Sequence, residues 1–220
     1  MDEADNVVPI TKRTGWRVAL ASAAVAAGLV VVFGPMIRTR LTGPSVETVV
    51  AAGEKSPYRP SPGRLSIEVP YKRPKPVLRN GGGEEPPLVD SEVPSEVYGV
   101  VEDLEAANRP DPHARGVAYL MEFKPKEAIP HLREAAKTDQ AAITDLAAAL
   151  IASGGDEELT EAIKLSEGSR TPTALWNRAM ALHNLRDEKS ALQAWKDYLA
   201  VDPTSPWAVE AREKMQDLAY

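Results

Sequence analysis

The feature that most constrains the fold is a 34-residue stretch, residues 172–205, which carries two helical patterns separated near Arg186. Two antiparallel helices approach closely only where their facing side chains are small, and Ala179 and Ala191 supply such side chains, one in each helix. A single helix pair cannot bury its apolar face, so similar units must stack against it. The C-terminal part of the chain is therefore predicted to be all-α.

The spacing in this stretch resembles the tetratricopeptide repeat (TPR) family. That family has small residues at repeat positions 8 and 20, an aromatic residue at 24 and proline at 32, and Ala179, Ala191, Trp195 and Pro203 match all four. Two positions depart from the pattern, with Arg178 in place of the usual leucine and Tyr198 in place of the usual alanine. The resemblance implies a TPR-like α-solenoid of antiparallel helix pairs.

Two earlier copies extend the solenoid to about three repeats. Residues 109–142 form one copy, with Gly116 and Ala128 at the two small positions. A degenerate copy lies between, with Ala147 and Ala162 at those positions and extra residues in its loop. Because the end faces of a solenoid must be covered, we expect capping helices over residues 95–108 and, after Ser205, residues 206–218.

The order of the segments is also similar to the N-terminal TPR region of bacterial CHAT-domain proteins, over residues 59–218. The segments that carry this likeness are PSPGRLS, VPYKRP, HARGVAYL, EAIPHLREAAK, DLAAAL, ALWNRAMALHNL and ALQAWKDYLAVDPTSPWAVEAR, and the stretch from LWNRAMAL to SPWAVEAR is the most specific. In that family the TPR repeats precede a caspase-like peptidase domain. That domain, with its cysteine and histidine dyad, is absent from this sequence, so the resemblance implies no protease activity for the chain.

An apolar segment near the N-terminus predicts a membrane anchor. Residues 18–37 are twenty residues without a charge, and as a helix they would span the ~30 Å hydrocarbon core of a bilayer. Trp16, Arg17 and Arg38 stand at its ends, where interfacial residues belong. We expect a tail over residues 1–15 and a transmembrane helix over residues 16–37. A cleaved signal peptide and a soluble hydrophobic helix are the alternatives.

The flanking charges favour an N-terminus inside the cell, because three basic residues precede the segment and two follow it. The chain is therefore predicted to be a single-pass protein of the bacterial inner membrane with an extracytoplasmic C-terminal domain. A cytoplasmic domain is the alternative.

A proline-rich linker is expected over residues 38–94. It holds ten prolines and three consecutive glycines, and its apolar content is low, so we predict a disordered, extended tether. Residues 95–220 would then form the helical domain. The segment PSPGRLSIEVPYKRPKP has two alternative interpretations, an exposed short strand and a docking peptide with basic character.

Composition and motifs argue against catalysis. The chain has no cysteine and a net charge of −6, which disfavours thiolate chemistry and binding to nucleic acid. Its three histidines lack partners at ligand spacing, and no phosphate-loop, dinucleotide, hydrolase or zincin motif occurs. We expect no enzyme activity, no cofactor, no metal and no small-molecule substrate.

The TPR resemblance implies a concave groove lined by the first helix of each repeat. Carried over position by position, the partner-binding residues are His113, Val117, Leu120, Met121, Thr144, Ala148, Ile151, Trp176, Met180, His183 and Asn184. Tryptophan and methionine are suitable anchors for a peptide or helix. Alanine at Trp176 or Met180 is expected to weaken partner capture without loss of helicity.

The function expected from the sequence is a non-enzymatic protein–protein interaction scaffold, a TPR domain tethered to a bacterial membrane that binds a peptide or helix of a protein partner. The regulatory half of a split or truncated CHAT-type peptidase is one alternative. An envelope assembly factor is another.

Overall fold

The structure, a computed structural model, describes residues 43–73 and 93–218. The predicted tail and transmembrane helix, residues 1–37, lie outside the described residues. Within those ranges, no helix has the length and apolar character needed to cross a bilayer. All regular elements in the described ranges are helices, which confirms the all-α prediction.

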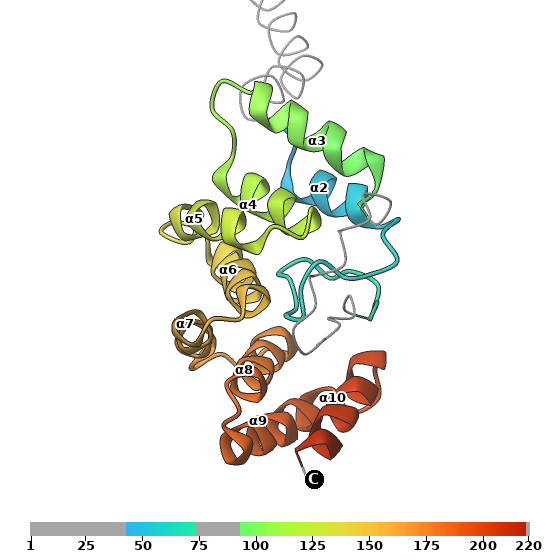
Figure 1. Cartoon of the computed structure of the whole chain (residues 1–220), viewed down its shortest axis with the longest axis vertical. Coiled ribbons are helices and arrows are strands. Elements are labelled where there is room, and N and C mark those ends of the chain that lie inside the picture. Colours follow the sequence, from blue (N-terminus) through green and yellow to red (C-terminus); the bar gives the residue numbers. More distant parts are fainter. Residues whose placement is uncertain (1–42, 74–92, 219–220) are drawn as a thin grey trace, which may run out of the picture.

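Nine helices are present in the described residues (Figure 1). They are α2 (Val46–Gly53), α3 (Ser95–Ala106), α4 (Pro112–Met121), α5 (Pro125–Ala135), α6 (Gln140–Ser153), α7 (Asp156–Ser166), α8 (Pro172–Asn184), α9 (Glu188–Val201) and α10 (Pro206–Asp217).

Local sequence signals set the helix ends. Asp111, Thr171 and Ser205 cap α4, α8 and α10, and each side chain accepts a hydrogen bond from a backbone N–H in the first turn. Proline follows each cap, at a position where a missing N–H costs nothing. Gly154, with φ +78°, ends α6 in the left-handed conformation that glycine adopts without strain.

The helices stack in chain order, each from α4 to α9 packing against the next, which is consistent with an α-solenoid (Figure 1). The predicted small residues are buried, as close packing of the helix pairs requires. A Cβ on Gly116 would stand 2.4 Å from the Leu132 Cγ atom. Ala128, Ala179 and Ala191 are fully buried. Close approach at these positions therefore holds the helices of each pair together.

The predicted linker differs most from the structure. Residues 43–73 pack against the helical domain instead of forming a disordered tether. The apolar side chains of this segment are few, but several of them are buried against the helices. Val46, Val49 and Val50 of α2 are buried where this helix packs on α3 and α4. The rest of the segment, residues 54–73, is here called the inner loop. It lies beside α6, α8 and α10 (Figure 1).

Candidate peptide-binding groove

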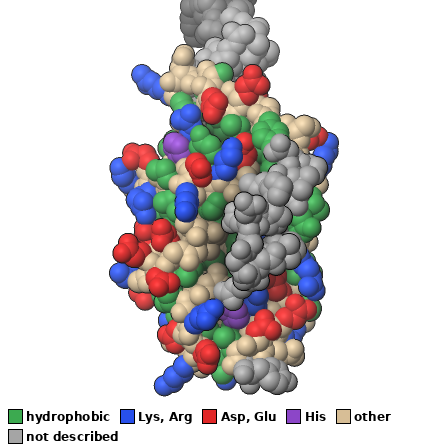
Figure 2. Space-filling view, viewed as in Figure 1, with side chains coloured by type: hydrophobic (Ala, Val, Ile, Leu, Met, Phe, Trp, Pro, Cys, Tyr) green, Lys and Arg blue, Asp and Glu red, His purple; other side chains and the backbone are tan. Residues whose placement is uncertain are grey.

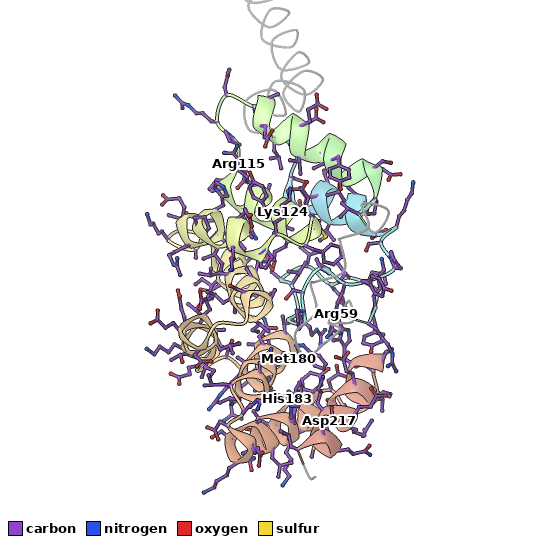
Figure 3. All side chains as sticks on the ribbon, in the orientation of Figure 1. Arg59, Arg115, Lys124, Met180, His183 and Asp217 are labelled. Carbon is purple, nitrogen blue, oxygen red and sulfur yellow. The ribbon has the colours of Figure 1, made fainter. Side chains whose placement is uncertain are left out.

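The first helices of the successive pairs, α4, α6 and α8, form an inner row, and α10 packs on α9 at the end of the stack. The inner loop runs along this row and hydrogen-bonds to α6 and α8, and its Arg59 lies against Trp176 of α8 and Glu210 of α10 (Figure 3). Part of the chain itself therefore fills the groove that the sequence predicted for a partner.

Two of the predicted groove residues bind the inner loop directly. The Trp176 Nε1 atom donates a hydrogen bond to the Pro62 carbonyl at 2.9 Å. The carbonyl of Ala148 accepts one from the Ser61 hydroxyl at 2.7 Å. These bonds fix the loop against α8 and α6.

The inner loop approaches α6 and α8 closely at Gly63. A Cβ on this residue would stand 2.8 Å from the Ala148 Cα atom and 3.1 Å from the Asn177 Oδ1 atom. The first of these neighbours is backbone, which cannot move aside as a flexible side chain would. Only glycine fits between α6 and α8 at this point.

Asn177, on α8, holds the backbone of the next residue from both sides. Its Oδ1 atom accepts a hydrogen bond from the Arg64 N–H at 2.6 Å, and its Nδ2 atom donates to the Arg64 carbonyl at 3.0 Å. A carboxamide can make this pair of bonds because it carries both an acceptor and donors. The contact selects an extended backbone whatever the side chain.

Asp145, on α6, binds Ser66 of the loop with both carboxylate oxygens. Oδ1 accepts a hydrogen bond from the Ser66 N–H at 2.6 Å, and Oδ2 accepts one from the Ser66 hydroxyl at 2.8 Å. Oδ2 also contacts the Nε2 atom of His113 at 2.6 Å, while the Nδ1 atom of His113 contacts Asp139 at 2.8 Å. The histidine thus joins α4 to the residue that grips the loop.

The environment of His113 favours its charged form. Burial by itself lowers the pKa of the imidazole, but hydrogen bonds and charges from Asp145 and Asp139 outweigh burial and raise it. The imidazolium then compensates the charge of Asp145, which is 1% exposed.

Arg59 makes the largest set of contacts. Its guanidinium donates to both carboxylate oxygens of Glu210 on α10, at 2.7 and 2.9 Å. Its remaining donors reach the carbonyls of Ser61, Pro62 and Lys72 at 2.9 to 3.3 Å. Both charged side chains are almost fully buried. Since every donor of the fork has an acceptor, this buried ion pair is fully satisfied.

Aromatic rings surround the two arginines of the loop. The guanidinium carbon of Arg59 lies 4.6 Å from the ring centroid of Trp207, and that of Arg64 lies 4.7 Å from the same ring. Tyr198 replaces the small residue expected at its repeat position. It is buried, and its hydroxyl donates to Asp202 at 2.6 Å and lies 3.4 Å from Arg64. Tyr198, which departs from the TPR pattern, therefore helps to form the aromatic surroundings of the two arginines.

The remaining predicted groove residues have mixed positions. Seven apolar ones belong to the buried core: Val117, Leu120, Met121, Ala148, Ile151, Trp176 and Met180. His113 is buried, Thr144 and His183 are partly exposed, and Asn184 is exposed. Figure 3 labels Met180 and His183 on α8. Trp176 and Met180 are 0% and 2% exposed with the inner loop in place, so neither presents a free surface here, and their role as anchors for a partner stays a prediction.

Sequence reasoning missed the polar groove residues. Asp145 and Asn177 fall at the same repeat position, one residue after Thr144 and Trp176, and each interrupts an apolar helical run. A polar residue at the same position of two repeats could have indicated a binding role from the sequence. Glu210 and Trp207 had none, because they lie in the capping helix, outside the repeat pattern.

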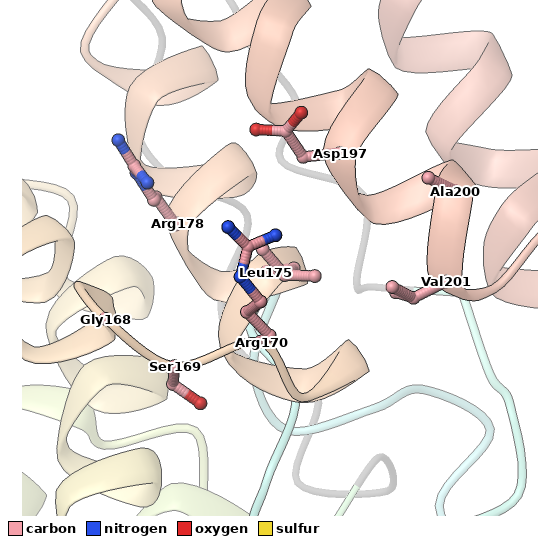
Figure 4. A pocket seen from close by; sticks show the side chains of 8 residues that line it. All are labelled: Gly168, Ser169, Arg170, Leu175, Arg178, Asp197, Ala200 and Val201. Carbon is pink, nitrogen blue, oxygen red and sulfur yellow. The ribbon is translucent and has the colours of Figure 1, made fainter.

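A second depression lies away from the groove, between the loop before α8 and the end of α9 (Figure 4). Its volume is about 300 Å³, and Arg170, Arg178, Asp197 and Val201 line it. It contains none of the predicted groove residues. Over the described ranges, no three His, Asp or Glu side chains are grouped as a metal site requires.

No family model, curated protein or solved structure matches the chain.

Proposed function

We propose that the chain is a membrane-tethered, non-enzymatic scaffold whose TPR-like groove binds a peptide segment, with its own inner loop as the built-in occupant. The observation that carries this proposal is the set of specific contacts between the groove helices and the inner loop. Side chains from α6 and α8 hydrogen-bond to the loop backbone, and α10 pairs with a loop arginine.

The contacts define what the groove accepts. Glu210 and Trp207 select an arginine, the gap between α6 and α8 selects a glycine four residues later, and Asp145 selects a serine three residues after that. In this chain those residues are Arg59, Gly63 and Ser66. A partner would present the same three residue types, at the same spacing, in a segment whose backbone follows the same course.

Charge supports the same assignment. The groove presents the carboxylates of Asp145, Asp202 and Glu210, and the segment that it holds carries Arg59 and Arg64. A basic partner segment would be attracted to this acidic surface, and an acidic one repelled.

The inner loop competes with any such partner. A tethered segment has an effective concentration in the millimolar range, so a free peptide must bind far more tightly to displace it. The scaffold would therefore accept a partner only when the loop is loosened. In the proposal, residues 16–37 hold the scaffold at the membrane, with the helical domain outside the cytoplasm.

The test is binding of a fluorescent peptide that spans residues 57–73, measured by anisotropy on the full chain. The unchanged protein should bind little, because its groove is full. Gly63→Ala should loosen the loop, since its Cβ would meet the Ala148 backbone, and the loosened chain should bind the wild-type peptide.

Two matched controls follow. Gly99→Ala adds a Cβ in open space on α3 and should leave peptide binding as low as in the unchanged protein. Asn177→Ala, added to Gly63→Ala, removes the backbone clamp and should abolish binding. A folded Gly63→Ala protein that binds no peptide would refute the proposal, because the loop would then be a permanent part of the core.

A further inference from the structure

The part of the chain that the structure describes begins close to the predicted anchor. A Cβ on Gly43 would lie 3.1 Å from the Leu104 Cδ2 atom and 3.4 Å from the Ala107 Cβ atom, so this residue is seated at the end of α3. Pro44 and Val46 are buried directly after it. Only residues 38–42 separate this packed segment from residue 37, the end of the predicted transmembrane helix.

Chain length limits the distance between the two. Six residue steps join residue 37 to residue 43, and at ~3.3–3.6 Å per step they reach about 20 Å when fully extended. A flexible linker over residues 38–94 would instead give a root-mean-square span of about 40 Å. The packing of α2 thus shortens the tether, because it fixes the chain to the domain near the start of the linker.

We infer that the α2–α3 end of the helical domain faces the lipid headgroup surface at close range, an orientation that rests on the membrane tether in the proposed function. α2 and α3 lie at one end of the long axis, and α9 and α10 lie at the other (Figure 1). The scaffold therefore stands on the membrane with its last helices pointing away.

The exposed side chains of α3 suit a headgroup layer and not the hydrocarbon core. Glu102, Asp103 and Glu105 are exposed and would lose hydration in hydrocarbon. Tyr98, 43% exposed, can contact the interface with its ring while its hydroxyl stays hydrated. The tether supplies the proximity, since an acidic surface has no attraction for anionic lipids.

The absence of cysteine from the sequence makes single-site labelling simple. We would reconstitute the full chain in phosphatidylcholine vesicles that contain rhodamine-labelled headgroups. A donor dye would be placed at Gly99→Cys on α3 or at Lys196→Cys on α9, both exposed positions. Four helix-to-helix steps, α3–α4–α6–α8–α9, separate the two sites by about 36 Å at roughly 9 Å per step.

Energy transfer to the lipids should be strong from position 99 and largely lost from position 196. A thirty-residue Gly/Ser insertion between residues 40 and 41 leaves the packed segment unchanged and should remove the transfer from position 99. Equal transfer from both sites, with no effect of the insertion, would overturn the inference while leaving the tether intact. Failure of the protein to float with the vesicles would overturn the tether itself, and this orientation with it.

Discussion

Two arginine–glutamate pairs show how the inner and outer faces of the helical domain differ. Arg59 and Glu210, in the groove, and Arg133 and Glu161, between α5 and α7, both have a shortest nitrogen–oxygen distance of 2.7 Å. The side chains of the first pair are 2% and 6% exposed, whereas those of the second are 51% and 37% exposed. The two ion pairs have the same distance but differ in their exposure to solvent.

The difference shows that the buried ion pair, and not the exposed one, contributes to specificity. An exposed ion pair gains little, since water solvates each charge almost as well. A buried pair is stable only when both charges are satisfied. A segment without an arginine at this position would therefore leave the buried carboxylate unpaired. The surface in Figure 2, where acidic and basic side chains are intermixed, favours solubility. The groove favours recognition of one segment.

The largest expected effect is from Arg59→Ala. The substitution leaves the buried Glu210 carboxylate without a cationic partner, with only the Tyr71 hydroxyl still donating to it, and removes the donors to three loop carbonyls. We expect a loss of about 3–5 kcal/mol in the free energy of unfolding, measured by urea denaturation. The paired change Arg59→Met with Glu210→Leu removes both charges and should cost less. If Arg59→Ala were no less stable than the double mutant Arg59→Met/Glu210→Leu, the burial of this ion pair would be contradicted.

Trp176→Ala tests whether the groove floor is core. The ring is fully buried and packs edge-on against Trp195, Tyr198 and Trp207 at centroid distances of 4.8 to 5.2 Å. We expect a loss of about 3–5 kcal/mol, because the cavity cannot collapse easily. Thermal melting by circular dichroism measures it. Unchanged stability with weakened peptide capture would instead support Trp176 as an anchor for the peptide.

Two glycine substitutions should act in opposite directions. Gly63→Ala forces a Cβ against the Ala148 backbone and should cost about 1–3 kcal/mol. Gly99→Ala, on an exposed face of α3 with nothing within 4 Å, should stabilise by roughly 0.5–1 kcal/mol. Urea denaturation of both variants measures the contrast. The same sign for both would contradict the close approach at Gly63.

Stability should fall as pH rises through the raised pKa of His113. The raised pKa means that the folded chain holds this proton more tightly than the unfolded chain does. Its contribution is complete below the unfolded value of about 6.5 and is lost above the folded pKa. Melting temperatures across pH 6 to 9 check this, with His113→Gln as the reference. Burial lowers the pKa of His131 and His183, so their contribution to stability rises with pH, opposite in sign to that of His113, and the reference variant keeps both.

The smallest effect is expected from Arg133→Ala. Because the pair with Glu161 is exposed, its removal should change the free energy of unfolding by about 0–1 kcal/mol. The same urea series used for Arg59→Ala measures it. A cost comparable to that of Arg59→Ala would erase the contrast between the two faces.

Much of the helical framework was predictable from local sequence. Caps such as Thr171 and Ser205 mark where helices start, and Gly154 marks an end, because each acts on backbone groups within a few residues. The pairing of helices through Gly116 and Ala179 was predictable too, since repeat spacing places small residues on facing sides. The TPR and CHAT resemblances stay predictions, because no comparison tests them.

The sequence by itself thus determined the helices and their order, through contacts between residues close in the chain. Only the tertiary structure decided that the proline-rich segment fills the groove. Its contacts join residues 79, 113 and 151 positions apart, between Ser66 and Asp145, Arg64 and Asn177, and Arg59 and Glu210. Composition does not reveal such contacts, because a segment poor in hydrophobic residues can still be ordered by hydrogen bonds and buried charges that distant helices supply.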